Sequence, residues 1–311
     1  MVGLGNDDYV EAVRFGLAKC AMATGNQPQV RSAALRALSL AIVVCSTDGE
    51  ATMDAMKLCY EISLGRYRGS DVAPSLQSAS LDCWGLLATT LEDDDISGSS
   101  ESIGSAFLED LKSCLDSTSQ EVMSSAGSNV SLIHECRLSL GVSDESATST
   151  DRKFGRGTWE GSPEEELMDD IICRMSELAQ DAGRRISKKV KRSQKCSFRD
   201  FLATVADGEI PTSTIQFRGG SLTLQGWRSM KKISFVRCCL QSSFLQQLIH
   251  NPALQAMFSL DMSVLNAKVS MSEYDKRTTV GKCSERKKGR DKDIKRDRKK
   301  KIMARDAVLY E

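Results

Sequence analysis

Hydrophobic residues in the first 183 positions recur mostly at steps of three and four, which is the spacing of amphipathic α-helices. In the segment EATMDAMKLCYEISL, for example, Met53, Met56, Cys59 and Tyr60 fall on one helix face. Five prolines in 311 residues leave few helices interrupted. The pattern predicts a mainly α protein, in which stripes of Met and Leu are packing surfaces rather than a cofactor site.

A sequence repeat with a period of 46 residues organises this helical part. The segments PQVRSAALRALSL, from Pro28, and PSLQSASLDCWGL, from Pro74, agree in type at six positions. A further step of 46 residues reaches EVMSSAGSNVSLI, where Gly127 replaces the leucine found at Leu35 and Leu81. Periods of about 40 to 47 residues are those of HEAT and armadillo arrays, whose helices bury their apolar faces by stacking. We therefore expect an armadillo- or HEAT-like α-solenoid over residues 1–183.

Two stretches poor in apolar residues interrupt the array. Residues 91–102 and 141–163 are rich in Ser, Gly and Asp, which predicts linkers without regular structure. The second stretch ends in SPEEELMDD, where Ser162 is expected to cap a helix and Pro163 to occupy its first turn. This helix is expected to be the last one of the array.

A change of pattern predicts a small α+β module over residues 195–260. Phe198 and Phe201 belong to an apolar stripe that predicts a helix, which Pro211 ends. TSTIQF and SLTLQGW then alternate apolar and polar residues on either side of a Gly-Gly pair, as β-hairpins do. A long helix is expected over residues 227–250. We expect these elements to fold without the solenoid, because their apolar positions are accounted for among themselves.

The net charge of zero is the sum of two opposite parts. Residues 1–181 hold 13 Lys and Arg against 30 Asp and Glu, and residues 182–311 hold 29 against 12, which gives net charges of −17 and +17. Such a split is typical of a basic interaction segment on an acidic body. Charged faces that only solvate the protein, or a tail that folds back on the body, would give the same composition. The expected basic elements are a bridge helix over residues 184–194 and a disordered tail over residues 270–311.

Basic side chains in and beside these two elements are candidate contacts to RNA or the ribosome. In the first element they recur mostly at three- and four-residue steps, which aligns them along one side of a helix. No aromatic residue is interleaved with the charges of the tail, so phosphate contact is expected rather than sequence-specific reading. The candidates are Arg184, Arg185, Lys188, Lys189, Lys191, Arg192, Lys195, Arg199, Lys295, Arg296, Arg298, Lys299, Lys300 and Lys301.

The sequence contains no recognisable motif for catalysis, for a cofactor or for a metal ion. His134 and His250 lie in apolar helical stretches, where a structural role is more common than metal ligation. The acidic run at residues 93–95 could hold a divalent cation, but a solvated linker is the more common role of such a run. The eleven cysteines show no C-x-x-C spacing, as expected of thiols in a reducing compartment. We therefore expect no enzymatic activity, no cofactor and no small-molecule substrate.

Features of secretion and of membrane insertion are missing from the sequence. No apolar leader opens the chain and no run of 18 apolar residues occurs. The glycosylation sequon at Asn129 should then stay unmodified. We expect the protein in the nucleus, the cytoplasm or both, without membrane contact.

Three blocks mark the C-terminal module: FRDFL, IPTSTIQF and FLQQLIHNPALQAMF, with Trp227 at the start of the long helix. They resemble the C-terminal domain of the interferon-related developmental regulator family, and the repeats before them are similar to its armadillo-like N-terminal domain. The resemblance runs from residue 10 to about residue 258 and is strongest over residues 188–258. It implies a non-enzymatic regulator of gene expression. Family members begin with a basic extension and further helices, so this chain is expected to be shortened at its N-terminus.

Two functions follow from these patterns. In the first, the solenoid is a scaffold for regulatory proteins, of the transcriptional co-regulator type, and KKVKR (188–192) and KRDRKKK (295–301) serve as import signals. In the second, the basic segments bind ribosomal RNA and the protein represses translation, as the resemblance implies for some members. We expect the first and keep the second as the alternative.

Overall fold

A computed structural model describes residues 7–46, 48–66, 72–143, 158–180, 188–217 and 220–260. The chain divides into two units. One comprises Met1–Ile215 and Leu222–Leu260 and holds the helices described below. The other consists of Gln216–Ser221, at the tip of a β-hairpin, and Asp261–Glu311. The predicted basic tail lies outside the described residues.

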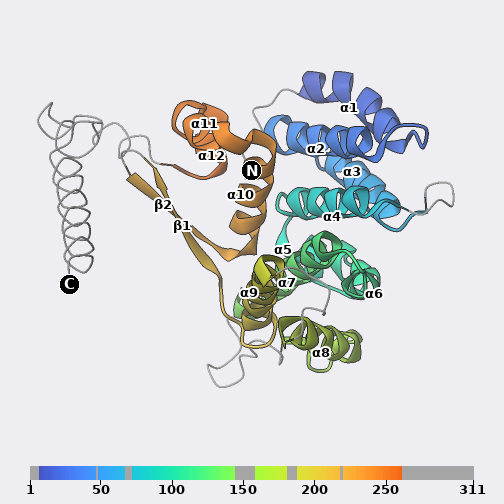
Figure 1. Ribbon diagram of the computed structural model, residues 1–311, viewed down its shortest axis with the longest axis vertical. Helices are drawn as coiled ribbons and strands as arrows, with labels where there is room; N and C mark the ends of the chain where they lie inside the picture. The colour runs from blue at the N-terminus through green and yellow to red at the C-terminus, as the bar shows by residue number, and fades with distance from the viewer. Residues whose placement is uncertain are drawn as a thin grey trace, which may run out of the picture. The chain divides into compact units, whose positions relative to one another are not determined.

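The helical array runs from α1 to α8 (Figure 1). The helices are α1 (Asp7–Met22), α2 (Pro28–Cys45), α3 (Gly49–Ser63), α4 (Pro74–Ala88), α5 (Asp93–Ser97), α6 (Ile103–Leu115), α7 (Gln120–Ser143) and α8 (Glu165–Gln180). Pro28 and Pro74 open α2 and α4, where a missing N–H leaves no helical hydrogen bond unmade. Asp48 caps α3 by accepting from the backbone N–H of Glu50 at 2.9 Å. The predicted mainly α fold is confirmed.

The three copies of the 46-residue repeat become three neighbouring helices. α2 packs against α4, and α4 packs against α7 (Figure 1). α3 packs on α4, and α6 packs on α7, which gives two helix pairs. The equivalent residues Leu35 and Leu81 are fully buried. Between the pairs, the rings of Trp84 and Phe107 lie with their centroids 4.9 Å apart. The solenoid-like arrangement predicted from the period is confirmed.

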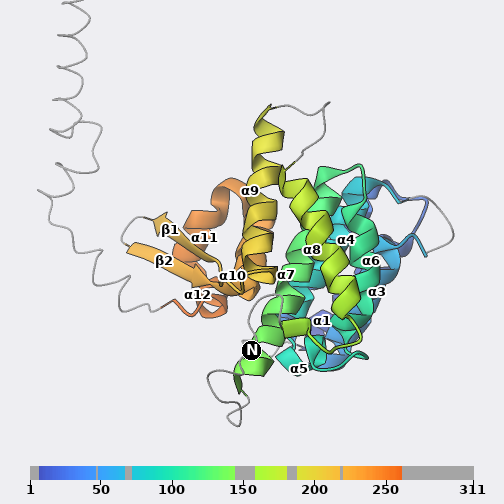
Figure 2. The same ribbon diagram turned by 90° about the horizontal axis from the view of Figure 1, so that it is seen from below.

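The third copy departs from the repeat because aromatic rings occupy the place of its leucine. These rings belong to α9 (Lys188–Val205), which packs against α7 and α8 (Figure 2). A Cβ atom on Gly127 would lie 2.7 and 2.8 Å from two ring carbons of Phe201, and 3.3 Å from one of Phe198. Only a residue without a side chain lets the rings approach α7 so closely. The irregular position in the repeat is therefore the point where α9 meets the array.

The predicted hairpin is confirmed, but the helix after it is shorter than expected. β1 (Thr212–Phe217) and β2 (Gly220–Gln225) form a two-stranded sheet. α10 spans Gly226–Leu240, so the prediction of one helix over residues 227–250 is wrong. Gln241 has a φ of 47°, which a right-handed helix cannot accommodate. After this break the chain forms η2 (Gln241–Ser243), α11 (Phe244–His250) and α12 (Pro252–Met257).

Helices α9 and α10 share their core with the array. Phe198 and Phe201 of α9 and Trp227 and Phe235 of α10 belong to the same continuous apolar core as Leu81. The expectation that the C-terminal elements account for their own apolar positions is therefore wrong for these two helices. The hairpin residues Ile215, Leu222 and Leu224 are buried without belonging to that core. The domain boundaries themselves stay a prediction.

The first of the two predicted linkers is structured. Within residues 91–102 the short helix α5 forms, and Ile96 in it is fully buried. The Ser102 hydroxyl donates to the carbonyl of Ile96 at 2.8 Å and closes the loop that follows. The prediction of a linker without regular structure is wrong here, because one buried apolar side chain anchors an otherwise polar segment.

The second predicted linker is described only at its ends. Residues 144–157 lie outside the described residues. Trp159, after them, is buried and donates its indole N–H to Nδ1 of His134 at 2.7 Å. α8 begins at Glu165, so the predictions that Ser162 caps this helix and that Pro163 lies in its first turn are both wrong.

Helix α2 has the length and the apolar composition that a membrane-spanning helix needs. In the structure it packs against α1 and α4. Its buried Arg31 donates the Nε–H to the carbonyl of Ala21 at 2.7 Å. These are the contacts of a core helix, in which a buried polar group is hydrogen-bonded.

Candidate binding groove

A carboxylate from α7 holds the first turn of α10. Gln225, which precedes α10, makes no capping bond with its side chain. Glu135 instead accepts from the backbone N–H groups of Trp227 at 2.6 Å and Arg228 at 3.4 Å. Gly226 has a φ of 80°, and a Cβ atom there would lie 2.7 Å from the Glu135 carboxylate. Burial raises the pKa of Glu135, and the two hydrogen bonds oppose that rise.

The Arg228 guanidinium fastens α10 to the end of α4. One of its terminal nitrogens donates to the backbone carbonyls of Thr89 at 3.0 Å and Leu91 at 2.8 Å. The other donates to the carboxylate of Asp93 at 2.5 Å. A planar guanidinium can serve several acceptors at once, and carbonyls at a helix C-terminus otherwise lack donors. Glu135 and Arg228 together fix α10 on both α4 and α7.

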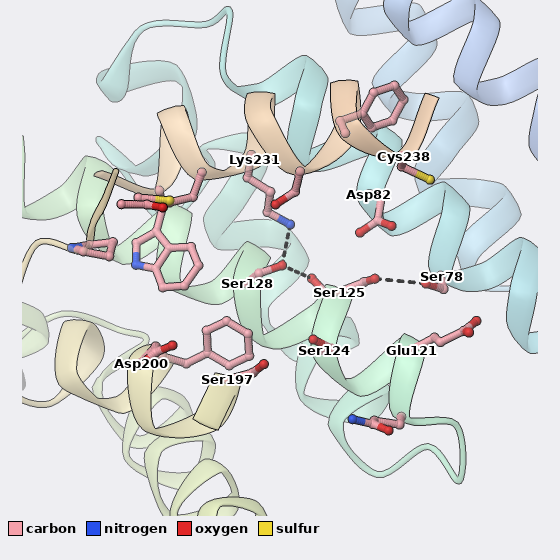
Figure 3. A pocket seen from close by; sticks show the side chains of 18 of the residues that line it. Ser78, Asp82, Glu121, Ser124, Ser125, Ser128, Ser197, Asp200, Lys231 and Cys238 are labelled. Atoms are coloured by element: carbon pink, nitrogen blue, oxygen red, sulfur yellow. Dashed lines mark hydrogen bonds between the residues drawn. The ribbon is translucent and has the colours of Figure 1, made fainter. Parts of the chain in front are cut away.

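An open groove with a volume of about 810 Å³ lies between α4, α7, α9 and α10 (Figure 3). Small hydroxyl side chains from several elements line it and leave this space unfilled. They are Ser78, Ser124, Ser125, Ser128, Ser197, Ser213 and Ser234. The volume is within the range of about 300–1,000 Å³ that is typical of ligand pockets.

A chain of hydrogen bonds crosses the floor of the groove (Figure 3). Lys231 donates to the Ser128 hydroxyl at 2.5 Å, and Ser128 donates to the backbone carbonyl of Ser125 at 3.0 Å. The hydroxyls of Ser125 and Ser78 lie 3.0 Å apart. These bonds connect α10, α7 and α4 through small polar side chains.

The floor also carries two charges of opposite sign. Lys231 is 7% exposed, and burial lowers its pKa to about 8 against the attraction of Asp82. Burial raises the pKa of Asp82, while the charge of Lys231 and a hydrogen bond with Ser125 oppose the rise. Both pKa shifts favour the uncharged form of the side chain, because both groups lose water on burial.

One wall of the groove is aromatic. The rings of Phe201 and Trp227 lie with their centroids 5.3 Å apart. The Trp227 indole N–H donates to the hydroxyl of Thr204 at 2.9 Å, which fixes the ring. Phe235 adds a third aromatic side chain to the lining. The groove therefore offers apolar surface beside its hydroxyl groups.

The predicted basic contacts are described only in part. Arg192 and Arg199 are exposed on α9, and Lys195 donates to the backbone carbonyl of Gln180. The backbone at Lys188, Lys189 and Lys191 belongs to α9, but their side chains lie outside the description, as do Arg184, Arg185 and every candidate in the tail. The role of this stripe in nucleic-acid binding stays a prediction.

The other candidate positions have structural roles. His134 is fully buried, and burial together with the nearby Arg137 lowers its pKa to about 4, so it is neutral at pH 7. The sequon residue Asn129 is fully buried and donates to the carbonyl of Leu81 at 2.9 Å. Within the described ranges, no three His, Cys, Asp or Glu side chains are placed to hold a metal ion together.

The groove was not predicted from the sequence, although two local signals point to it. The first is Gly127 in the place of a repeat leucine. The second is the spacing of Trp227, Lys231 and Phe235, which recur at four-residue steps and so place a lysine between two aromatic residues on one helix face. A lysine in such a stripe indicates a buried charge that needs polar partners on a neighbouring element.

The fold defines a helical-repeat protein, and an open groove lies between four of its helices. Residues 3–206 match the family model of the interferon-related developmental regulator (IFRD). Because the match covers more than half of the chain, the protein belongs to the IFRD family, whose members are in general non-enzymatic regulators of gene expression. A comparison with curated proteins found no match. The family match covers the array and α9 and ends before the hairpin, whereas the resemblance was strongest over residues 188–258.

Proposed function

We propose that this protein is a non-enzymatic scaffold that regulates gene expression by holding a protein partner in the groove between α4, α7, α9 and α10. The observation that carries the proposal is a groove of about 810 Å³ whose walls are joined by the Glu135 and Arg228 contacts. Walls that are ordered before binding lose little entropy when a partner docks. The expected partners are regulatory proteins, in the manner of a transcriptional co-regulator, in the nucleus or the cytoplasm.

The test is to block the groove in cells. Ser124 is half-buried in the lining, so Ser124→Tyr places a ring in the groove. Glu109 on α6 is exposed and not part of the lining, so Glu109→Tyr is the matched control. In cells depleted of the endogenous protein, transcript levels should be restored by the wild type and by Glu109→Tyr but not by Ser124→Tyr. Full restoration by Ser124→Tyr would contradict the proposal.

A specific observation favours a second candidate function, ribosome-associated repression of translation. Arg192 and Arg199 are exposed and seven residues apart, so they share one side of α9. Two cations held at a fixed spacing on a packed helix can orient the protein on a phosphate surface.

Sedimentation separates this alternative from the scaffold. If it holds, the protein should sediment with ribosomes, and Arg192→Glu with Arg199→Glu should release it while Ser124→Tyr should not. Deleting residues 276–311 should weaken binding and reduce its salt dependence, because each phosphate contact contributes a slope of about 0.7–0.9. Sedimentation free of ribosomes at low salt would exclude the alternative.

A further inference from the structure

We propose that the groove binds an extended peptide segment that carries a lysine or arginine side chain, and that Asp82 and Glu121 receive this side chain. The inference rests on the proposed scaffold function and specifies the chemistry of the bound segment. Three properties of the groove support it: carboxylates that no described residue pairs with, a buried cation with donors that no described residue uses, and an aromatic wall beside small hydroxyl groups.

The carboxylates lie at the same end of the groove (Figure 3). Asp82 comes from α4 and Glu121 from α7, and their charges repel each other. Lys231 and Arg36 attract Asp82, yet among the described residues no cation comes within 4.0 Å of either carboxylate. A cationic side chain from a partner would form charge-assisted hydrogen bonds there and relieve the repulsion.

The buried ammonium of Lys231 supplies the complementary contact. An ammonium has three donors, and within the described part of the chain Lys231 uses one of them, on the Ser128 hydroxyl. A buried donor without an acceptor is unfavourable, so a ligand that provides an oxygen here gains affinity. A backbone carbonyl meets this need without adding negative charge.

The charges around the groove decide against an anionic ligand. Asp82, Glu121 and Asp200 line it, and they outnumber the cations Arg36 and Lys231. A phosphate or a nucleic-acid backbone would be repelled by these carboxylates, since like charges brought together across an interface disfavour binding. The same carboxylates attract a basic peptide.

The remaining surface fits an extended chain. Serine hydroxyls both donate and accept, so a row of them matches the alternating N–H and C=O groups of a peptide backbone. The aromatic wall of Phe201 and Trp227 can hold an apolar side chain or an aliphatic stem from another position of the same segment. Hydroxyls, aromatic wall and carboxylates therefore specify different parts of the same ligand.

The experiment uses the full chain and a phage-displayed library of random short peptides. Enriched peptides are synthesised with a fluorophore, and their Kd is measured by anisotropy on the wild type and on Asp82→Asn, Glu121→Gln and the control Glu109→Gln. We expect enriched peptides to contain Lys or Arg, and each groove variant to weaken binding by about twofold to fivefold, with no change in the control. Citrulline in place of the peptide arginine should weaken binding to the wild type and have little effect on binding to a variant that combines Asp82→Asn with Glu121→Gln.

Glu121 is exposed in the first turn of α7, so Glu121→Gln keeps the test valid even if Asp82→Asn fails to fold. Enrichment of acidic peptides, an unchanged Kd in the groove variants, or no enrichment over a surface without protein would each overturn the inference. If the peptide experiment contradicts the inference but Ser124→Tyr still does not restore transcript levels in cells, the proposed scaffold function stands. Only the preference for a lysine- or arginine-containing segment is then refuted.

Discussion

Replacing Gly127 by alanine tests whether α9 docks where the repeat is broken. In an uncrowded helix, Gly→Ala is stabilising by about 1 kcal/mol. At Gly127 the new Cβ atom would lie 2.7 Å from a ring carbon of Phe201, inside the optimal carbon–carbon separation of about 3.5–4.0 Å. Phe201 is 4% exposed and packs on Phe198 and Trp227 with ring centroids 5.2 and 5.3 Å away, so its ring has little room to move.

Two opposing contributions set the expected result. Overpacking a tight core costs about 1–3 kcal/mol, and the gain in helix propensity is about 1 kcal/mol. We therefore expect Gly127→Ala to lower the free energy of unfolding by about 1 kcal/mol. Gly16 in α1 is the control, because nothing lies within 4 Å of a Cβ atom placed there. Gly16→Ala should raise the free energy of unfolding by about 1 kcal/mol.

A second background isolates the contact. Phe201→Ala alone should cost about 3–5 kcal/mol, but without the ring Gly127→Ala should become stabilising by about 1 kcal/mol. Urea unfolding, followed by far-UV circular dichroism and tryptophan fluorescence, measures each variant. The reversal of sign corresponds to a coupling of about 2 kcal/mol between the two residues.

One contradicting result is that Gly127→Ala stabilises the wild type as much as Gly16→Ala does. The other is that the effects of Gly127→Ala and Phe201→Ala on the free energy of unfolding are additive. Either result would mean that the Phe201 ring does not pack on α7 in solution.

Three further changes test other parts of the structure. Leu81→Asp puts an unpaired charge at a fully buried position and should destabilise the protein by about 2–5 kcal/mol; an unchanged Tm would contradict the repeat packing. Arg228→Lys cannot reach Asp93 and two carbonyls together, so it should cost about 2 kcal/mol in urea unfolding despite the conserved charge; wild-type stability would refute the fastening. Lowering the pH from 6.5 to about 4 should destabilise the fold by up to about 3 kcal/mol, because the unfolded chain takes up a proton that buried His134 does not. His134→Asn, whose amide can still accept from Trp159, should remove this part of the pH dependence in melts across the same range.

The array was predictable because its signals are local or regular. Helical periodicity marks each buried face, and the 46-residue period places equivalent faces on neighbouring helices without knowledge of any particular contact. Predictions of linkers and helix ends were wrong where one contact or one backbone angle overrides the local composition. Ile96 anchors a segment that is otherwise as polar as a linker, and the positive φ of Gln241 interrupts an apolar pattern that continues through it.

The groove could not be predicted for the same reason. Its lining comes from segments far apart in the chain, and a serine has no periodic signal of its own. Lys231 and Gly127 are the exceptions, since each breaks an apolar pattern at a position that packing would otherwise fill. Such breaks mark the contact between two elements, but they do not identify the partner element until the fold is known.

The cap on α10 has a consequence for the order of folding during synthesis. Its acceptor, Glu135, precedes Trp227 by 92 residues, so α7 is complete long before the first turn of α10 exists. Until it reaches that carboxylate, the start of α10 has N–H groups without partners and gains little by becoming helical alone. α10 is thus expected to become helical only after it docks on the folded array. A chain arrested before α10 should contain a folded array in which the Glu135 carboxylate does not yet accept from the backbone of α10.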